Sequence, residues 1–218
     1  LYHWSHLELK QVFGINEYVT FDNWESIYDQ MNTYIENEKL SPRKLISRAN
    51  VKFIGTTDNP LDSLEWHKKI ADDKSFDTVV APTFRPDEAF ISHANFVRFV
   101  EKLEKLTEQK VNTFVEFMNA LEERIKFFVQ YGCKASDISF GEIQFRRASE
   151  NELNEILQKV FKHEEITFEE VEKWQTEVFL KLCALYKKYH LVTQVHFGAV
   201  RNTNSKYFEK LGPDTGFD

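Results

Sequence analysis

Polar and ionisable side chains follow four short apolar segments of the sequence, at the points where strands are predicted to end. Segment by segment they are Thr57 and Asp58 after residues 51–55, Arg85 after 78–82, Asp137 within 135–139, and His196 and Arg201 in or after 192–197. A guanidinium is a planar donor that suits a carboxylate, and an imidazole can transfer protons near neutral pH. These residue types therefore predict a site that binds an anion and moves a proton.

Each of these residues also has a purely structural interpretation. Asp58 could cap a helix that begins at Pro60. Arg85 could pair with Asp87 in a solvated loop, and Asp137 could be a turn residue. A histidine inside a strand is more often a core group than a catalytic one. The sequence contains no His-x-His pair, glycine-rich phosphate loop, nucleophile elbow or Cys-x-x-Cys motif that would decide the matter.

Helices and strands are predicted to alternate along the chain and to place these residues. Helix starts are indicated by Asp22 with Glu25, Ser41 before Pro42, Asn59 before Pro60, Thr167 with Glu170, and an apolar stripe over residues 111–128. The predicted strands are Val51–Gly55, Thr78–Pro82, Ala135–Ser139 and Val192–Phe197. Such alternation indicates a parallel sheet, and ligands collect at the carboxyl ends of parallel strands. We therefore predict an α/β fold whose polar strand ends converge on one face.

The aromatic and histidine residues outside the strand ends are assigned structural roles. The tryptophans fall in helical stripes and are expected in the core: Trp4, Trp24, Trp66 and Trp174. The other histidines show no ligand-type clustering and are expected at the surface or at helix ends: His3, His6, His67, His93, His163 and His190.

The composition limits the partners of the protein. Its 28 Lys and Arg against 35 Asp and Glu give a net charge of -7, which argues against a nucleic-acid surface. No apolar run reaches the roughly 18–20 residues that span a membrane. Cys133 and Cys183 are far apart and lack metal-type spacing, so we expect a reduced, cytoplasmic compartment.

Five motifs, in one order and with conserved spacing along essentially the whole chain, resemble the uronate (glucuronate) isomerase family. They are "YHWSHLELKQVFGI", "TTDNPLDSLEWH", "PTFRPDEAF", "GCKASD" and "TQVHFGAVRNTNSKYFEKLGPDTGFD". The family belongs to the metal-dependent amidohydrolase-like (β/α)8 barrels. The resemblance implies the isomerisation of D-glucuronate to D-fructuronate and of D-galacturonate to D-tagaturonate. The proton would pass between C2 and C1 through an enediol, with a divalent metal, zinc in the first place, near the site.

The resemblance also implies roles for individual residues. His196 and Asp137 are expected to be catalytic, and Arg85, His196, Thr57, Asp58 and Arg201 are expected to bind the sugar acid. The sequence departs from the family pattern at two places, where Ile138 follows "SD" in place of histidine and Asn59 replaces an aspartate. These departures bear on the roles of Asp137 and Asp58.

The metal-binding residues of the family lie on the first and last strands of the barrel, outside these 218 residues. We therefore expect a central fragment, inactive by itself, with about four of the eight barrel strands and with no metal ligand in this chain. Residues 1–50 would form a helical segment that precedes or inserts into the barrel. Residues 51–218 would form a partial barrel with extra long helices.

Two other functions remain compatible with the sequence. One is metal-dependent hydrolysis on the same amidohydrolase-type barrel, which flanking residues suited to a two-metal centre would favour. The other is a catalytically inert binding module, which an assay of this chain with zinc and glucuronate would distinguish. In every case the expected partner is a small sugar acid, neither nucleic acid nor membrane, with a homo-oligomer possible.

Overall fold

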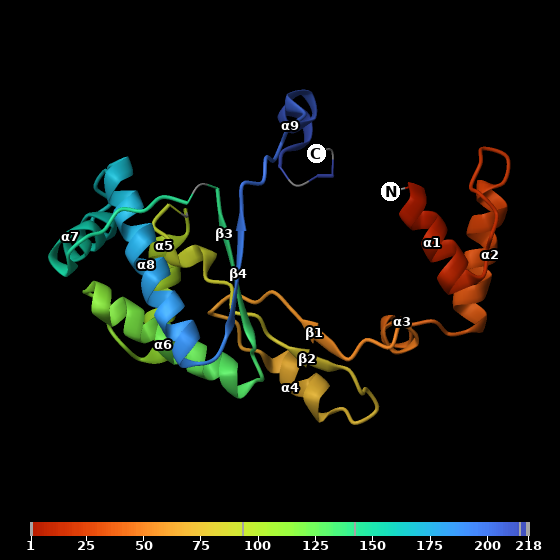
Figure 1. Cartoon of the computed structure of the whole chain (residues 1–218), viewed down its shortest axis with the longest axis horizontal. Coiled ribbons are helices and arrows are strands. Elements are labelled where there is room, and N and C mark those ends of the chain that lie inside the picture. Colours follow the sequence, from red (N-terminus) through yellow and green to blue (C-terminus); the bar gives the residue numbers. More distant parts are fainter. Residues whose placement is uncertain (1, 93, 142, 214, 217–218) are drawn as a thin grey trace. The chain divides into compact units, whose positions relative to one another are not determined.

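The computed structural model describes residues 2–92, 94–141, 143–213 and 215–216 of the chain (Figure 1). Helices and strands alternate, as predicted. In chain order the elements are α1 (Tyr2–Phe13), α2 (Trp24–Asn37), α3 (Pro42–Arg48), β1 (Phe53–Gly55), α4 (Glu65–Asp72), β2 (Val79–Ala81), the 3-10 helix η1 (Asp87–Ala89), α5 (Phe96–Thr107), α6 (Phe114–Gln130), β3 (Ala135–Phe140), α7 (Glu150–Phe161), α8 (Phe168–Lys188), β4 (Val192–Phe197) and α9 (Ser205–Leu211). No helix in the described ranges is both long and apolar enough to cross a membrane.

The chain divides into two compact units. The smaller unit comprises Leu1–Ile54 and Ile70–Val79 and contains α1, α2 and α3. The larger unit comprises Gly55–Lys69 and Val80–Asp218. Every residue that the sequence assigns to the site therefore belongs to the larger unit.

The strands pair in parallel and follow one another in sequence order. β3 and β4 are in register from Ala135 opposite Val192 to the last residue of each strand, and β1 pairs with β2. Phe84, just after β2, joins the two pairs, because it forms parallel bridges to Asp58 on one side and Ser136 on the other. The prediction of about four parallel strands is confirmed.

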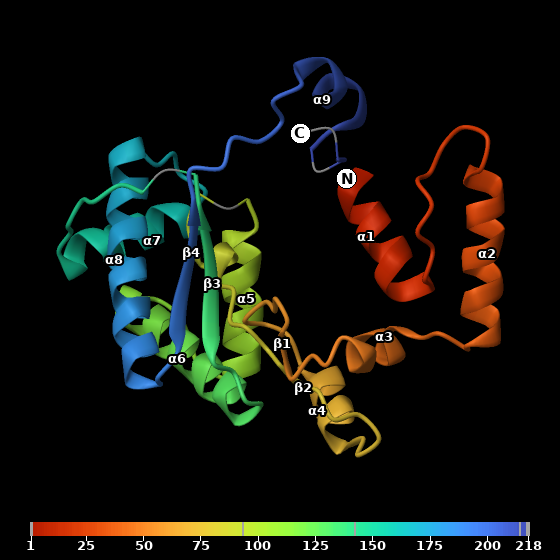
Figure 2. The same ribbon diagram turned by 45° about the vertical axis from the view of Figure 1, so that its right-hand side comes forward.

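One aromatic core lies between the sheet and the helices of the larger unit. Figure 1 shows α5, α6 and α8 to the left of β3 and β4, the paired strands that lie side by side in Figure 2 as well. Trp174 of α8 is fully buried there, with its ring centroid 5.5 Å from Phe96 and 5.4 Å from Phe114. Its Nε1–H donates to the Ala89 carbonyl at 3.1 Å. The core thus reaches η1, which immediately follows the strand-end segment of β2.

Two of the predicted helix starts are confirmed by their caps. The Ser41 hydroxyl accepts from the Lys44 amide, with Pro42 as the first residue of α3. Thr167 and Glu170 form a complete capping box at the start of α8. Each cap satisfies amides that have no partner within the helix.

Two predicted N-caps are wrong. α4 begins at Glu65 and not after Asn59, because the Asn59 and Asp62 side chains each bond a nearby backbone amide and stabilise a turn. α2 begins at Trp24, after an Asn23 that makes no side-chain cap bond, so the expected pairing of Asp22 with Glu25 does not form.

The expectation of four core tryptophans is also wrong. Trp4, Trp24 and Trp66 are exposed, and only Trp174 is buried. Trp66 lies instead with its ring under the Lys69 ammonium, 3.9 Å from the ring centroid. A helical stripe predicts a common face but does not say which face meets the core.

The remaining histidines differ in position. His67, expected at the surface, is buried, whereas His163 and His190 each lie two residues after the last residue of α7 and α8, as expected for helix ends. His93 lies outside the described residues.

Candidate active site

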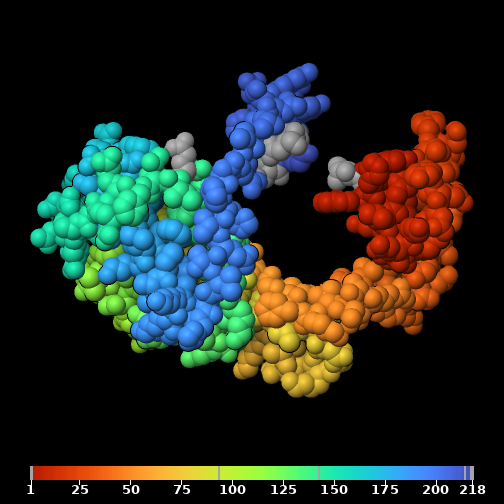
Figure 3. Space-filling view, viewed as in Figure 1, coloured from red at the N-terminus to blue at the C-terminus, as the bar shows by residue number. Residues whose placement is uncertain are grey.

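The alternation of side chains along β3 and β4 separates a core face from a ligand face. Ile138 is fully buried and Val195 packs against the same core, and these two residues are register partners. The neighbouring residue on each strand, Asp137 before Ile138 and His196 after Val195, must point to the opposite face. Asp137 and His196 are therefore brought to the face of the sheet away from the helices. β4 is exposed along most of its length, and Figure 3 shows this blue segment at the molecular surface.

Asp137 links the two other ionisable residues of this face. Its Oδ2 accepts from Arg85 Nη1 at 3.3 Å, and its Oδ1 lies 2.6 Å from His196 Nε2. The contact with the imidazole is close enough for an ion pair but is not aligned as a hydrogen bond. The Asp137 side chain is only 10% exposed, whereas that of His196 is 61% exposed. The carboxylate is thus an inner group that leaves the imidazole accessible to a ligand.

Arg85 is held by a second carboxylate. Its Nε donates to Asp87 Oδ2 at 2.8 Å, and Asp87 Oδ1 accepts from the Ser139 amide at 3.2 Å. The pKa of Arg85 is raised, first by the hydrogen bond with Asp87, so the guanidinium stays charged. The loop pairing with Asp87 that the sequence left open does form, and it occurs together with the contact to Asp137. Both carboxylates fix the plane of the guanidinium.

Thr57 and Asp58 point in different directions. Thr57 is exposed, and by alternation it shares the face of Arg85. Asp58 is in register with Phe84, whose ring packs edge-to-face on Phe128 of α6. The Asp58 carboxylate therefore lies on the core side, and the structure does not bring it to Asp137 and His196. Nor does Asp58 cap a helix, since α4 begins at Glu65.

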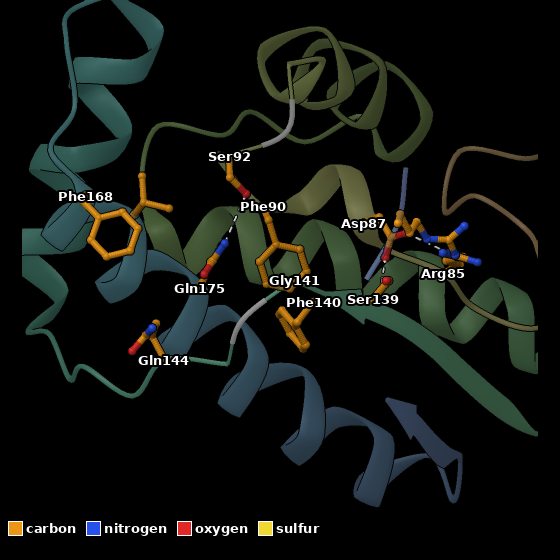
Figure 4. A pocket seen from close by; sticks show the side chains of 12 residues that line it. Arg85, Asp87, Phe90, Ser92, Ser139, Phe140, Gly141, Gln144, Phe168 and Gln175 are labelled. Atoms are coloured by element: carbon orange, nitrogen blue, oxygen red, sulfur yellow. Dashed lines mark hydrogen bonds and ion pairs between the residues drawn. The ribbon is translucent and has the colours of Figure 1, made fainter. Parts of the chain in front are cut away.

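Two adjoining cavities open beside these residues. The smaller, of about 390 Å³, is lined by Arg85, His196 and Arg201 among others. The larger, of about 850 Å³, is drawn in Figure 4, where Arg85, Asp87 and Ser139 cluster on one side and Gln175 donates to Ser92 on the other. The cavities share the following residues: Arg85, Ser139, Phe140 and Arg201. Both predicted arginines therefore border the same space.

The backbone after β4 leaves room for a ligand. Gly198 has a φ of +71°, in the left-handed region where glycine is favoured, and a Cβ built on it would meet nothing within 4 Å. Ala199 lines the smaller cavity. The small residues after His196 therefore border open space.

The described residues do not form a metal cage. Among them, no group of three or more His, Cys, Asp or Glu side chains is placed to hold a metal ion. Asp137 and His196 form a pair of possible ligands but not a complete set. The described residues therefore do not form a complete site for a divalent ion by themselves.

One buried contact had no sequence signal. Thr56 and His67 are eleven residues apart, yet the Thr56 hydroxyl lies 2.7 Å from His67 Nε2. A strand-end residue and a helix residue at that separation follow no periodicity, so only the folded structure reveals their contact.

Comparisons with known proteins agree with this fold. A model of the glucuronate isomerase family matches residues 1–218. The chain is 58% identical to a uronate isomerase of Streptococcus uberis over 218 residues, which are 47% of that relative's length. It is 38% identical to a uronate isomerase of Caldanaerobacter subterraneus, again over 47% of its length. The chain thus spans about half the length of the curated relatives it matches.

Two solved structures also resemble this chain in fold over its whole length. A crystal structure of uronate isomerase from Thermotoga maritima superposes with a TM-score of 0.90 and 29% identity, covering all of this chain and 48% of the other. Glucuronate isomerase from Caulobacter crescentus superposes with a TM-score of 0.85 over 46% of its chain. At 24% identity, the second likeness concerns the fold alone.

Proposed function

We propose that this chain, which belongs to the glucuronate isomerase family, forms the substrate-binding half of a uronate isomerase. The enzyme would interconvert D-glucuronate with D-fructuronate and D-galacturonate with D-tagaturonate. The observation that carries the proposal is the Asp137 carboxylate, which contacts both Arg85 and His196 beside one open space. A uronate matches these groups, because it has a carboxylate at one end and, at the other, a carbonyl whose neighbouring C–H is acidic.

In this proposal the two arginines bind the C6 carboxylate. Arg85 is held charged and oriented by Asp87 and Asp137, and Arg201 borders the same cavity. Charge-assisted bonds from a planar guanidinium suit a carboxylate. Thr57, exposed on the same face, would add a hydroxyl contact, while Asp58 would support the strand end from the core side.

His196 and Asp137 would act near the carbonyl. Because Nε2 lies against Asp137, Nδ1 is the nitrogen that a ligand can meet. In the isomerisation, the proton on C2 leaves to a base and returns to C1, while the C2 hydroxyl proton passes to the oxygen on C1. An imidazole whose Nδ1 hydrogen-bonds a substrate oxygen would stabilise the enediol between these steps.

Further features of the complete enzyme belong to the same proposal. A divalent metal, zinc in the first place, would need ligands beyond the Asp137 and His196 pair of the described residues. Residues 1–50 would be a helical segment, and residues 51–218 part of a (β/α)8 barrel, which the TM-score with the Thermotoga maritima enzyme supports. The net charge of -7 argues against a nucleic-acid partner, and the two widely separated cysteines favour a reduced, cytoplasmic compartment.

A segment exchange tests this function. The matching part of the Streptococcus uberis enzyme, 47% of its length, is replaced by these 218 residues. We expect the chimera to convert glucuronate to fructuronate, and the 218-residue chain alone to show no turnover with zinc. A folded chimera that binds zinc but converts no uronate would refute the proposal. Turnover by the isolated chain would show that its residues suffice for catalysis.

A further inference from the structure

A buried polar cluster lies behind the ligand face, at the end of β1. Thr56 Oγ1 is 2.6 Å from Asp58 Oδ2, 2.7 Å from His67 Nε2 and 3.3 Å from the Ala81 carbonyl. The His67 and Asp58 side chains are only 10% and 13% exposed. Thr56, Asp58, His67 and Ala81 all belong to the larger unit.

The hydrogen positions in the cluster follow from counting donors. A carboxylate and a carbonyl only accept, so the single Thr56 hydroxyl proton goes to Asp58, which is the nearer of the two. His67 Nε2 must then carry a proton and donate it to Thr56 Oγ1. The chain of bonds runs in one direction, from His67 through Thr56 to Asp58. His67 Nδ1 is buried and has no hydrogen-bond partner in the described part of the chain.

The end of this chain of bonds holds two strand ends together. Asp58 Oδ2 also accepts from the Thr83 amide at 3.1 Å. The Asp58 carbonyl accepts from the Arg85 amide at 2.9 Å. The orientation of Asp58 therefore sets the backbone at Arg85, whose side chain faces the cavity on the other side of the sheet.

We propose that His67 is a positioning residue, which orients Asp58 through the Thr56 hydroxyl and so holds Arg85 where it binds the uronate carboxylate. The proposal rests on the function proposed above for Arg85. A purely structural imidazole would affect stability alone, whereas a positioning imidazole affects substrate binding in a folded protein.

The test uses the chimera and four variants, each checked for folding by circular dichroism. His67→Phe removes the donor and keeps a ring, and Thr56→Val removes the hydroxyl with little change of shape. We expect each to raise KM for glucuronate about tenfold, with kcat within about twofold, because binding and not the chemical step is impaired. The double variant should be no worse than either single one. His67→Gln, whose amide nitrogen can replace Nε2, should restore KM to within about twofold of the parent.

Several outcomes would overturn the proposal. One is an unchanged KM in a folded His67→Phe chimera, and another is an equal loss in the Gln and Phe variants. NMR of the imidazole nitrogens in the 218-residue chain gives a readout without activity. We expect the Nε2-protonated form of His67, and the Nδ1-protonated form would contradict the assigned direction. An inactive parent chimera would count against the proposed function, and the NMR result would still decide the direction of the bonds.

Discussion

The Asp137 carboxylate contacts the His196 imidazole diagonally across two parallel strands. The register partner of Asp137 is Gln194, and His196 is opposite Ser139, yet Asp137 Oδ1 lies 2.6 Å from His196 Nε2. Residues two apart on a strand share a face, so a long side chain can reach its diagonal neighbour. Asp137 contacts Arg85 from the same position. One inner carboxylate thus orients both groups that face the ligand.

Replacing Asp137 by Asn in the chimera tests this arrangement. The amide keeps the shape but removes the charge that faces Arg85 and His196, so we expect kcat/KM for glucuronate to fall at least about tenfold. Steady-state kinetics measure the effect. Asp77→Asn, at an exposed aspartate of the smaller unit, is the matched control and should leave kcat/KM within about twofold. Equal kcat/KM values for the two variants would show that Asp137 is not a functional residue of the site.

A second prediction concerns the shape of the Arg85 side chain. Its guanidinium bonds Asp87 through Nε and Asp137 through Nη1, and a lysine ammonium lacks this rigid planar arrangement of donors. We expect Arg85→Lys and Arg85→Met to raise KM for glucuronate by similar factors, about tenfold or more. Arg98→Met, at an exposed arginine of α5, is the control. A lysine variant with the parent KM would mean that charge alone matters.

The ligand face could be predicted from the sequence, but only in part. β4 was predicted residue for residue, since "VTQVHF" is rich in β-branched and aromatic residues. The convergence of Arg85, Asp137 and His196 followed from parallel strands in sequence order. The direction of Asp58 could not be predicted, because adjacent strand residues face opposite sides and the three-residue β1 has no pattern to say which side is which.

Helix starts show a similar limit. Thr167 and Asn59 are both residue types that are typical of an N-cap. Only Thr167 is followed, three residues later, by a glutamate that completes a capping box. At Asn59 the side chains stabilise a turn instead, and α4 starts at Glu65. Short polar side chains serve both structures, so local sequence leaves the choice to tertiary contacts.

A third prediction concerns pH and the start of α7. Glu152 accepts from the Ser149 amide and from Lys173 Nζ at 2.9 Å. These bonds, the one from the Ser149 amide first, lower its pKa from 4.5 to about 2. A carboxyl with a lowered pKa stabilises the fold above its unfolded pKa, and this contribution is lost as pH falls toward the folded value.

We therefore expect Glu152→Gln to lower the Tm of the 218-residue chain at pH 7. The difference from the parent should begin to shrink below pH 4.5 and vanish near pH 2, as the folded and unfolded pKa values require. Thermal scans by circular dichroism across this range measure it. Glu150→Gln, in the same helix turn, controls for the helix dipole and should show a smaller difference at pH 7. A Tm difference independent of pH would contradict the assignment.

The last prediction tests the connection between core and site. Trp174 is fully buried, and its Nε1–H donates to the Ala89 carbonyl of η1, two residues after the Asp87 that holds Arg85. Trp174→Phe loses this bond and leaves a cavity, so we expect the free energy of unfolding to fall by about 2 kcal/mol. Urea unfolding of the 218-residue chain measures the change. Trp66→Phe, at a tryptophan that is 65% exposed, should change it by less than about 0.5 kcal/mol. In the chimera, Trp174→Phe should also raise KM for glucuronate, because η1 and Asp87 lose their support from the core. A destabilised chimera that keeps the parent KM would show that this core contact does not influence substrate binding.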